Sequence, residues 1–332
     1  MAVEKLLRNS EKAVLGALEQ GARRPFSAIA KHLKTSQQLV SYLVNAIEKK
    51  GIMKGYYTLI DYSKLDVLNF QVYLKVSYIN KEKFDTLVEF LAAEPHTGIV
   101  LSCGGRYDII CSFFAKNPSQ FNKACRAVIE KFPEQIKDYI ILTIIVNRDF
   151  GRKYLFKDSA LLMQNVIGGD REPEEIDETD MKILDALSQD ARKNAVMIGQ
   201  NIDLTPKSII ERIKKLHSRR IIKGFRPMIY PRKMGIIPIL LLIKYHNISV
   251  NLENEMINFL KFHPAVVSIL KTLGEWDIEI RIETLNQAEF RKTEIEIRQK
   301  FATLIQQIES IPIYKAHKVN YFPKFLLENK KK

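Results

Sequence analysis

The sequence lacks the cysteine and histidine patterns that hold disulfide-rich or zinc-dependent folds together. Its 332 residues include three cysteines, Cys103, Cys111 and Cys125, and no two of them are spaced as CxxC. The six histidines form neither an HxH nor an HExxH pattern. We therefore expect no metal and no cofactor, and we interpret the cysteines as small core residues of a protein kept in a reducing compartment.

Long apolar runs are also missing. The longest, Ile236–Ile243 and Tyr139–Val146, are far shorter than the roughly 20 residues that a membrane-spanning helix needs. The segment Met1–Ser10 is charged and is followed by no apolar core, so it does not resemble a secretion signal. We expect a cytoplasmic protein that does not contact a membrane.

Positive charge is in excess. Lysine and arginine number 52 against 38 aspartates and glutamates, which gives a net charge of +14. A polyanion such as nucleic acid is a natural partner for such a surface, although a generally basic proteome would give the same excess.

The two halves of the chain repeat each other at a fixed offset of 169 residues, without a gap over most of their length. The register predicts two copies of one unit of about 150 residues each, a common size for a compact unit. Matched pairs include Leu15/Leu184, Ala22-Arg23/Ala191-Arg192, Lys54-Gly55/Lys223-Gly224, Lys75/Lys244, Gly105/Gly274 and Asp108-Ile109/Asp277-Ile278.

The first third of each copy predicts three short helices followed by a strand. In the second copy, Thr205-Pro206 has the pattern of an N-cap followed by proline at the first helical position. The predicted helices cover Lys12–Glu19, Phe26–His32 and Ser36–Lys49 in the first copy, and Asp180–Leu187, Ala195–Asn201 and Thr205–Ser218 in the second.

Three short helices and a trailing strand are typical of a winged helix-turn-helix, whose third helix enters the major groove of double-stranded DNA. A helical protein-binding module with a solvated polar face is the alternative. The basic residues favour DNA, because residues 1–56 hold ten basic and four acidic side chains, and residues 176–226 hold eleven and seven. The candidate DNA-binding residues are Ser36, Gln37, Gln38, Ser41, Tyr42 and Asn45, and Thr205, Lys207, Ser208, Glu211, Arg212 and Lys215.

The remaining two thirds of each copy alternates strand and helix in the order βαββαβ, which is the ferredoxin-like plan. The alternating segment Asp277–Glu283 predicts a sheet with one polar or partner-facing side. The expected fold class is therefore α+β, with two winged helix-turn-helix domains and two ferredoxin-like domains. Between the copies, the apolar stretch Tyr154–Val166 predicts a short helix within a linker.

These residues resemble the leucine-responsive and asparagine-responsive (Lrp/AsnC) family of transcription regulators. The resemblance rests on the opening Ile176–Arg192, on Arg212–Leu216 with Ile221–Phe225, and on the G-x-x-D stretches Gly105–Asp108 and Gly274–Asp277. The first copy departs from the pattern, because Arg8 and Glu11 replace an acidic pair and Leu43 stands where Arg212 does.

The resemblance implies ferredoxin-like domains of the RAM type ("regulation of amino-acid metabolism"), which pair through their sheets and bind a small effector such as an amino acid. It carries effector binding onto Gly105, Asp108, Gly274 and Asp277, although each aspartate also suits a purely structural role in its turn. Two fused units suggest a pseudo-dimer within one chain or a homo-oligomer through the RAM domains. The expected domains are 1–56 and 176–226 (winged helix-turn-helix), 57–150 and 227–323 (RAM), 151–175 (linker) and 324–332 (basic tail).

Two other functions stay open. Siroheme decarboxylases share this architecture and would be enzymes, but neither Ile236–Ile243 nor Phe70–Val76 matches their strand motif. A sensor that binds an effector without DNA is the second alternative. No catalytic residues are predicted.

Overall fold

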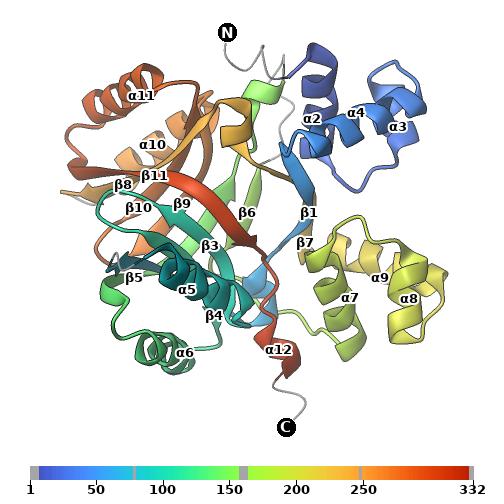
Figure 1. Ribbon diagram of the computed structural model, residues 1–332, viewed down its shortest axis with the longest axis horizontal. Helices are drawn as coiled ribbons and strands as arrows, with labels where there is room; N and C mark the ends of the chain where they lie inside the picture. The colour runs from blue at the N-terminus through green and yellow to red at the C-terminus, as the bar shows by residue number, and fades with distance from the viewer. Residues whose placement is uncertain (1–6, 78–79, 157–163, 247–248, 329–332) are drawn as a thin grey trace. The chain divides into compact units, whose positions relative to one another are not determined.

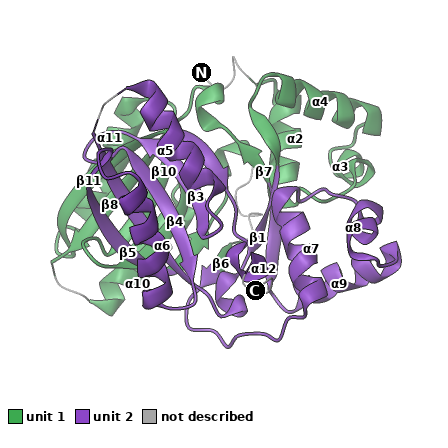
Figure 2. Cartoon of the chain, turned by 60° about the horizontal axis from the view of Figure 1, so that its bottom comes forward, with its two compact units in different colours: residues 1–55, 146–166, 227–314 green, residues 56–145, 167–226, 315–332 purple. Residues whose placement is uncertain are grey.

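The computed structural model describes residues 7–77, 80–156, 164–246 and 249–328, and the chain divides into two compact units (Figure 2). Unit 1 comprises residues 1–55, 146–166 and 227–314, and unit 2 comprises residues 56–145, 167–226 and 315–332. Each unit therefore joins the helical segment of one copy to the sheet segment of the other. The domain boundaries expected from the sequence stay predictions, since the units follow a different grouping of the chain.

The sheet segment of unit 2 confirms the ferredoxin-like plan. Strand β4 pairs antiparallel with β2 and β3, and β2 also pairs antiparallel with β5, which gives the order β3-β4-β2-β5. Its elements are β2 (Leu68–Val76), α5 (Lys81–Ala93), β3 (Thr97–Cys103), β4 (Ile109–Ala115), α6 (Pro118–Lys131) and β5 (Ile136–Asp149), whose last four residues belong to unit 1.

The sheet segment of unit 1 has the same order of elements (Figure 1). Strand β10 pairs antiparallel with β8 and β9, and β8 pairs with β11. The elements are β8 (Ile237–Tyr245), α10 (Val250–Phe262), β9 (Val266–Leu273), β10 (Ile278–Thr284), α11 (Gln287–Lys300) and β11 (Ile305–Val319), whose end belongs to unit 2.

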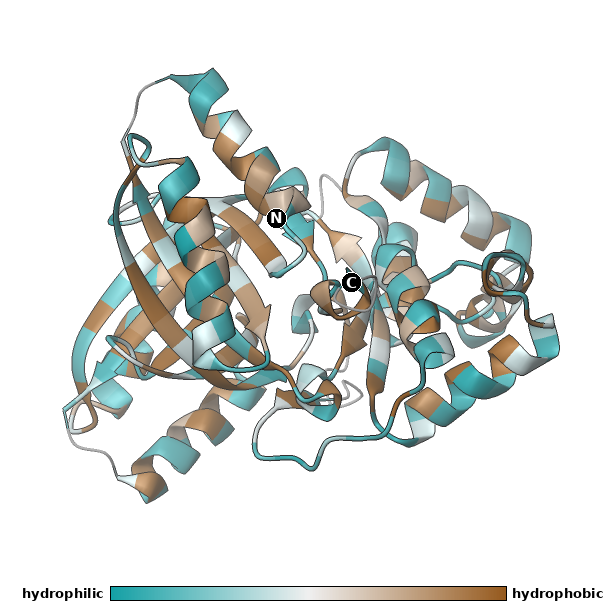
Figure 3. Ribbon diagram, turned by 90° about the horizontal axis from the view of Figure 1, so that it is seen from below, coloured by the Kyte–Doolittle hydropathy of each residue, from teal (hydrophilic) through white to brown (hydrophobic). Residues whose placement is uncertain are grey.

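The helices on these sheets are amphipathic, and their hydrophobic sides are visible in Figure 3. In α5, Leu87 and Leu91 are buried against strand residues such as Val100. In α10, Met256 and Leu260 do the same in unit 1. An asparagine or serine side chain caps the start of each sheet-covering helix and accepts a backbone N–H, which fixes where the helix begins. The caps are Asn80, Asn117, Ser249 and Asn286.

Each unit also has three helices in the order expected of a helix-turn-helix. They are α2 (Asn9–Gln20), α3 (Phe26–His32) and α4 (Gln37–Lys49) in unit 1, and α7 (Glu178–Gln189), α8 (Ala195–Ile202) and α9 (Pro206–Ser218) in unit 2. The trailing strands are β1 (Met53–Ile60) and β7 (Ile222–Ile229). Within unit 1 the Tyr230 N–H donates to the Ile52 carbonyl, and within unit 2 the Asp61 N–H donates to the Ile221 carbonyl.

The expected helix at Tyr154–Val166 is wrong where the structure describes it. Lys153–Leu155 is a single 3-10 turn and Asn165–Gly168 is a strand, β6, while residues 157–163 lie outside the described part of the chain. Strands β5 and β11 extend beyond Tyr139–Val146 and Pro312–Val319, the ranges that the sequence predicts for them, because polar exposed residues such as Lys137, Gln306 and Gln307 interrupt the apolar pattern without ending the strand. In the expected basic tail, Phe325–Glu328 forms α12, and residues 329–332 are outside the described range.

Candidate nucleic-acid interface

The N-cap and the buried side chains of helix α9 in unit 2 determine which side of the helix faces solvent. The Thr205 hydroxyl accepts the Ser208 N–H at 3.2 Å, and Pro206 occupies the first helical position, as the sequence predicts. Its buried residues Ile209, Ile213 and Leu216 belong to the unit 2 core. The opposite side of α9 is therefore exposed, and it carries Lys207, Ile210, Glu211, Lys214 and Lys215.

Arg212 has a different setting from the other predicted DNA-binding residues of α9. Its Nη1 donates to Asp177 Oδ2 at 2.7 Å and to Asp180 Oδ1 at 2.8 Å, and its side chain is 33% exposed. The hydrogen bond to Asp177, followed by that to Asp180, contributes most to raising the pKa of Arg212, so its guanidinium stays charged. Since Asp177 is itself the cap of α7, Arg212 fastens α9 to the start of α7.

Helix α4 in unit 1 has the same cap and the same phase. The Ser36 hydroxyl accepts the Leu39 N–H at 3.1 Å, and the buried residues are Val40, Leu43, Val44 and Ile47. Its exposed side is neutral where that of α9 is basic. Of the predicted residues, Gln37, Gln38, Tyr42 and Asn45 are exposed and Ser41 is half-buried.

In unit 1 the ion pair that connects the third helix to the first helix is made by different residues from those in unit 2. Leu43 is buried at the position of Arg212, and Glu11 at the start of α2 instead accepts from Lys50 Nζ at 2.7 Å. Lys50 corresponds through the repeat to Arg219, which in unit 2 pairs with Glu174 at 2.8 Å. In both units a cation on the third helix or at its C-cap pairs with a carboxylate near the first helix, but the cation occupies different positions in the two units.

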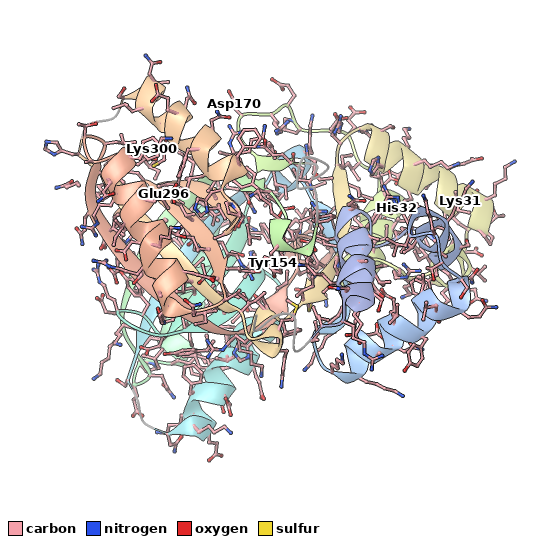
Figure 4. All side chains as sticks on the ribbon, turned by 90° about the horizontal axis from the view of Figure 1, so that it is seen from above. Lys31, His32, Tyr154, Asp170, Glu296 and Lys300 are labelled. Carbon is pink, nitrogen blue, oxygen red and sulfur yellow. The ribbon has the colours of Figure 1, made fainter. Side chains whose placement is uncertain are left out.

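Basic residues in unit 1 gather around α3 rather than α4. Lys31 and His32 lie next to each other on α3 and are exposed (Figure 4). Lys34 in the following turn is also exposed, with φ at 53°, as Asp203 has 59° in the corresponding turn of unit 2. In helix-turn-helix proteins the first helix of the pair crosses the DNA backbone. The α3 region therefore suits phosphate contacts.

The two G-x-x-D turns have the same internal hydrogen bonds. Asp108 Oδ2 accepts the Val76 N–H at 2.9 Å and lies 3.2 Å from Lys75 Nζ. Asp277 Oδ2 accepts the Tyr245 N–H at 2.8 Å and lies 3.3 Å from Lys244 Nζ. These aspartates hold their own turns, and effector binding there stays a prediction.

The glycines of these turns have backbone conformations that favour glycine, with φ at 89° for Gly105 and 146° for Gly274. Each lysine of the turn donates to the glycine carbonyl, from Lys75 to Gly105 at 3.4 Å and from Lys244 to Gly274 at 3.1 Å. The repeated lysine pair is visible in the sequence register, but its role in the turn is not.

Sequence reasoning missed two exposed residues of α9, Ile210 and Lys214. The cap at Thr205 fixes the helix phase, so steps of three and four residues from Lys207 would have found both. In the described residues, no group of three or more histidine, cysteine, aspartate or glutamate side chains is placed to hold a metal ion. No described helix is long and apolar enough to cross a membrane.

Comparison with known proteins agrees with this geometry. The profile of the AsnC-type helix-turn-helix domain matches residues 176–217, which contain α7, α8 and nearly all of α9. The HTH-type transcriptional regulator FL11 of Pyrococcus furiosus is 30% identical over 115 residues, covering 34% of this chain and 74% of that protein. The regulatory protein AsnC of Haemophilus influenzae is 30% identical over 136 residues, covering 41% and 85%.

A solved structure shares the fold over nearly the full length. The siroheme decarboxylase NirDL has a TM-score of 0.62 and covers 96% of this chain and 97% of its own, at 12% identity. At that identity the likeness shows the fold alone, whereas the relatives that are 30–32% identical over the aligned 102 to 115 residues are named as transcription regulators. The chain belongs to the AsnC/Lrp family of DNA-binding, helix-turn-helix transcription regulators.

Proposed function

We propose that this regulator binds double-stranded DNA sequence-specifically through α4 and α9, and that the two helices contribute differently. The observation that carries the proposal is the matched phase of the two capped helices, which present a basic side in α9 and an amide-rich side in α4. Lysine contacts with phosphates supply affinity, whereas glutamine and asparagine side chains pair with base edges.

The predicted residues fall into two groups: those exposed to solvent, and those whose side chains already make hydrogen bonds or ion pairs within the protein. Lys207, Glu211 and Lys215 are exposed on α9, and Gln37, Gln38, Tyr42 and Asn45 are exposed on α4. The Ser36 and Thr205 hydroxyls cap their helices, and Arg212 is paired with two aspartates. We assign direct DNA contact to the exposed set and a positioning role to Ser36, Thr205 and Arg212.

The finer parts of the proposal concern regulation and assembly. A small effector, in the class of the amino acids, modulates DNA binding. The two copies act as a pseudo-dimer within one chain or assemble further through their RAM domains, in the cytoplasm. An imperfect palindrome is the natural operator, because the two reading helices differ.

The test is a titration of the full chain against a labelled duplex from the region upstream of its own gene and against a scrambled duplex. We expect specific binding at least about a thousandfold tighter than binding to the scrambled sequence. Affinity should fall steeply between about 50 and 200 mM salt. Equal affinity for both duplexes would overturn sequence-specific binding, and no binding to either would overturn the proposal.

The enzyme alternative has its own readout. Adding haem or siroheme to the purified protein should give no absorbance band of a tightly bound complex. A stoichiometric band with a shifted maximum would favour a tetrapyrrole enzyme of the NirDL fold instead.

A further inference from the structure

Two large apolar side chains lie on the exposed side of α4 in unit 1. Leu39 is 43% exposed and Tyr42 is 60% exposed. They are three residues apart, so they are neighbours on the helix surface, and we call them the apolar pair of α4. The buried side of the helix is formed by Val40, Leu43, Val44 and Ile47, so the apolar pair lies outside the core.

Amide side chains surround the apolar pair. Gln38 comes directly before Leu39, and Asn45 follows Tyr42 by three residues, and both amides are exposed. The Ser36 hydroxyl accepts the Leu39 N–H at 3.1 Å, which places Leu39 in the first turn of the helix. In helix-turn-helix proteins the first residues of the third helix contact the edges of bases. The apolar pair therefore begins where base contacts are expected.

Positive charge lies nearby on the preceding helix. Lys31 and His32 of α3, both labelled in Figure 4, and Lys34 in the following turn are exposed. A stable protein interface buries at least about 1,200 Å² around an apolar centre, which two side chains among amides do not provide. An anionic partner with small, separated apolar groups fits this surface better.

The second copy has polar residues at both positions. Through the 169-residue offset, Leu39 corresponds to Ser208 and Tyr42 to Glu211. Ser208 is half-buried and Glu211 is exposed in α9. The scaffold thus accepts a serine and a glutamate where α4 has its apolar pair. Folding does not require the pair, so its explanation lies in what α4 binds.

Double-stranded DNA offers one apolar group in the major groove, the 5-methyl group of thymine. Apolar side chains contact this methyl group, whereas glutamine and asparagine pair with N6 and N7 of adenine. The exposed side of α4 combines these two kinds of side chain, which together match both bases of an A·T pair.

We propose that Leu39 and Tyr42 contact thymine 5-methyl groups in the major groove, so that unit 1 selects its half-site by methyl groups as well as by adenine edges. This rests on the proposed function, because α4 must lie in the groove. The contacts are uncharged, so they add sequence preference without adding salt dependence.

The first experiment uses the full chain and two forms of the duplex from the region upstream of its own gene. One form contains thymidine, and the other contains deoxyuridine at every thymidine position, which removes only the 5-methyl groups. We expect tighter binding of the thymidine form, by about fourfold for each methyl group removed from water. That ratio should be the same at about 50 and 200 mM salt. Equal affinity for the two forms, or a ratio that disappears with salt, would overturn the methyl contact.

Variants then assign the ratio to the apolar pair. Leu39→Ser introduces the residue of the second copy, and Tyr42→Ala removes the ring; each should lower the thymidine-to-deoxyuridine ratio about fourfold. Leu39→Met keeps an apolar side chain and should hold the ratio within about twofold of wild type. Val196→Ser changes a residue of α8 that is 51% exposed and should leave the ratio unchanged.

A ratio of two affinities measured on the same protein is insensitive to a general loss of stability. A wild-type ratio in both Leu39→Ser and Tyr42→Ala would overturn the assignment and point to another partner, such as a protein, for the apolar pair. Binding to neither form of the duplex would instead overturn the proposed function. Specific binding with no preference for thymidine would overturn the methyl contact alone.

Discussion

The two helix-turn-helix segments have the same cap, turn and buried side, and they differ in what they expose. Helix α9 carries four basic residues and one acidic residue, whereas α4 carries one of each. The exposed positions of α4 include the amides Gln37, Gln38 and Asn45 and also Tyr42, which is 60% exposed. The two copies thus share a scaffold and differ in surface chemistry, which supports our proposal that α9 supplies phosphate affinity and α4 reads bases.

The two units also differ in the side chains at one matched position beside their sheet segments. In unit 1, Lys12 and Glu283 line a cavity of about 610 Å³. Through the 169-residue offset they correspond to Met181 and Phe114, which are buried with Phe325 in one apolar cluster of unit 2. An apolar filling stabilises the unit by burial, whereas buried charged residues cost stability unless they are paired and hydrogen-bonded. The same position is a cavity with charged lining residues in unit 1 and a packed apolar cluster in unit 2.

The largest expected effect contrasts these two fillings. Arg152→Ala removes the buried guanidinium that Glu283 and Glu19 share, leaving Glu283 with Arg281 and the Tyr154 hydroxyl, and should lower the free energy of unfolding by about 3 kcal/mol at pH 7. Phe114→Ala in unit 2 should cost a similar amount, about 3–5 kcal/mol, because it opens an apolar void.

Lowering the pH distinguishes the loss of a buried ion network from the loss of apolar packing. The folded pKa of Glu283 is lowered, so its contribution is present above the unfolded pKa and is lost as the pH falls through the folded pKa. The deficit of Arg152→Ala in urea unfolding should therefore shrink as the pH falls below that range, and the deficit of Phe114→Ala should not. Equal pH dependence of both deficits would remove the distinction between a charged and an apolar filling.

The fold could be predicted from the sequence because its signals are local. The Thr205-Pro206 cap, the repeated strand–helix order and the G-x-x-D turns each follow from a few neighbouring residues. The role of Arg212 could not, because it depends on how Asp177 and Asp180 pack against α9. Nor could the cavity, since Lys12, Tyr154 and Glu283 are far apart in the chain and meet only after folding.

The next effect concerns the turns of the two helix-turn-helix segments. A Cβ at Gly199 would collide with the Leu204 carbonyl oxygen, whereas the corresponding residue of the first copy is Ala30. Gly199→Ala should cost about 1–3 kcal/mol in urea unfolding, as overpacking does, and weaken DNA binding by displacing α9. The matched variant Ala30→Gly should cost about 1–2 kcal/mol, from the helix propensity difference and the loss of one buried methyl group. If Gly199→Ala cost no more than Ala30→Gly, the tight turn would not position α9.

The smallest effect uses one lysine of each unit, Lys153, which is buried, and Lys318, which is half-buried. Burial lowers the pKa of Lys153 to about 8 and that of Lys318 to about 8, against 10.5 for the free side chain. Between pH 8 and 10.5 the unfolded chain binds the extra proton, so each lysine makes stability rise with pH in that window.

From pH 7 to pH 9 the rise should be about 1 kcal/mol per lysine. It is measured as the difference between wild type and Lys153→Met, or wild type and Lys318→Met, so that other titrating groups cancel. Both differences should show the rise. A rise for one variant only would show that the two units bury these lysines unequally.

The division of work between α9 and α4 is tested most directly by the salt dependence of DNA binding in two triple variants. Lys207, Lys214 and Lys215 are changed to alanine in one, and Gln37, Gln38 and Asn45 in the other, with Lys116, Lys123 and Lys137 of the sheet segment as a charge-matched control. The lysine variant should lower the salt slope by about three and weaken binding to all sequences alike. The amide variant should keep the slope and lose preference for the operator, and the control should match wild type. Equal slopes for the lysine and amide variants, or an unchanged operator preference in the amide variant, would contradict the account.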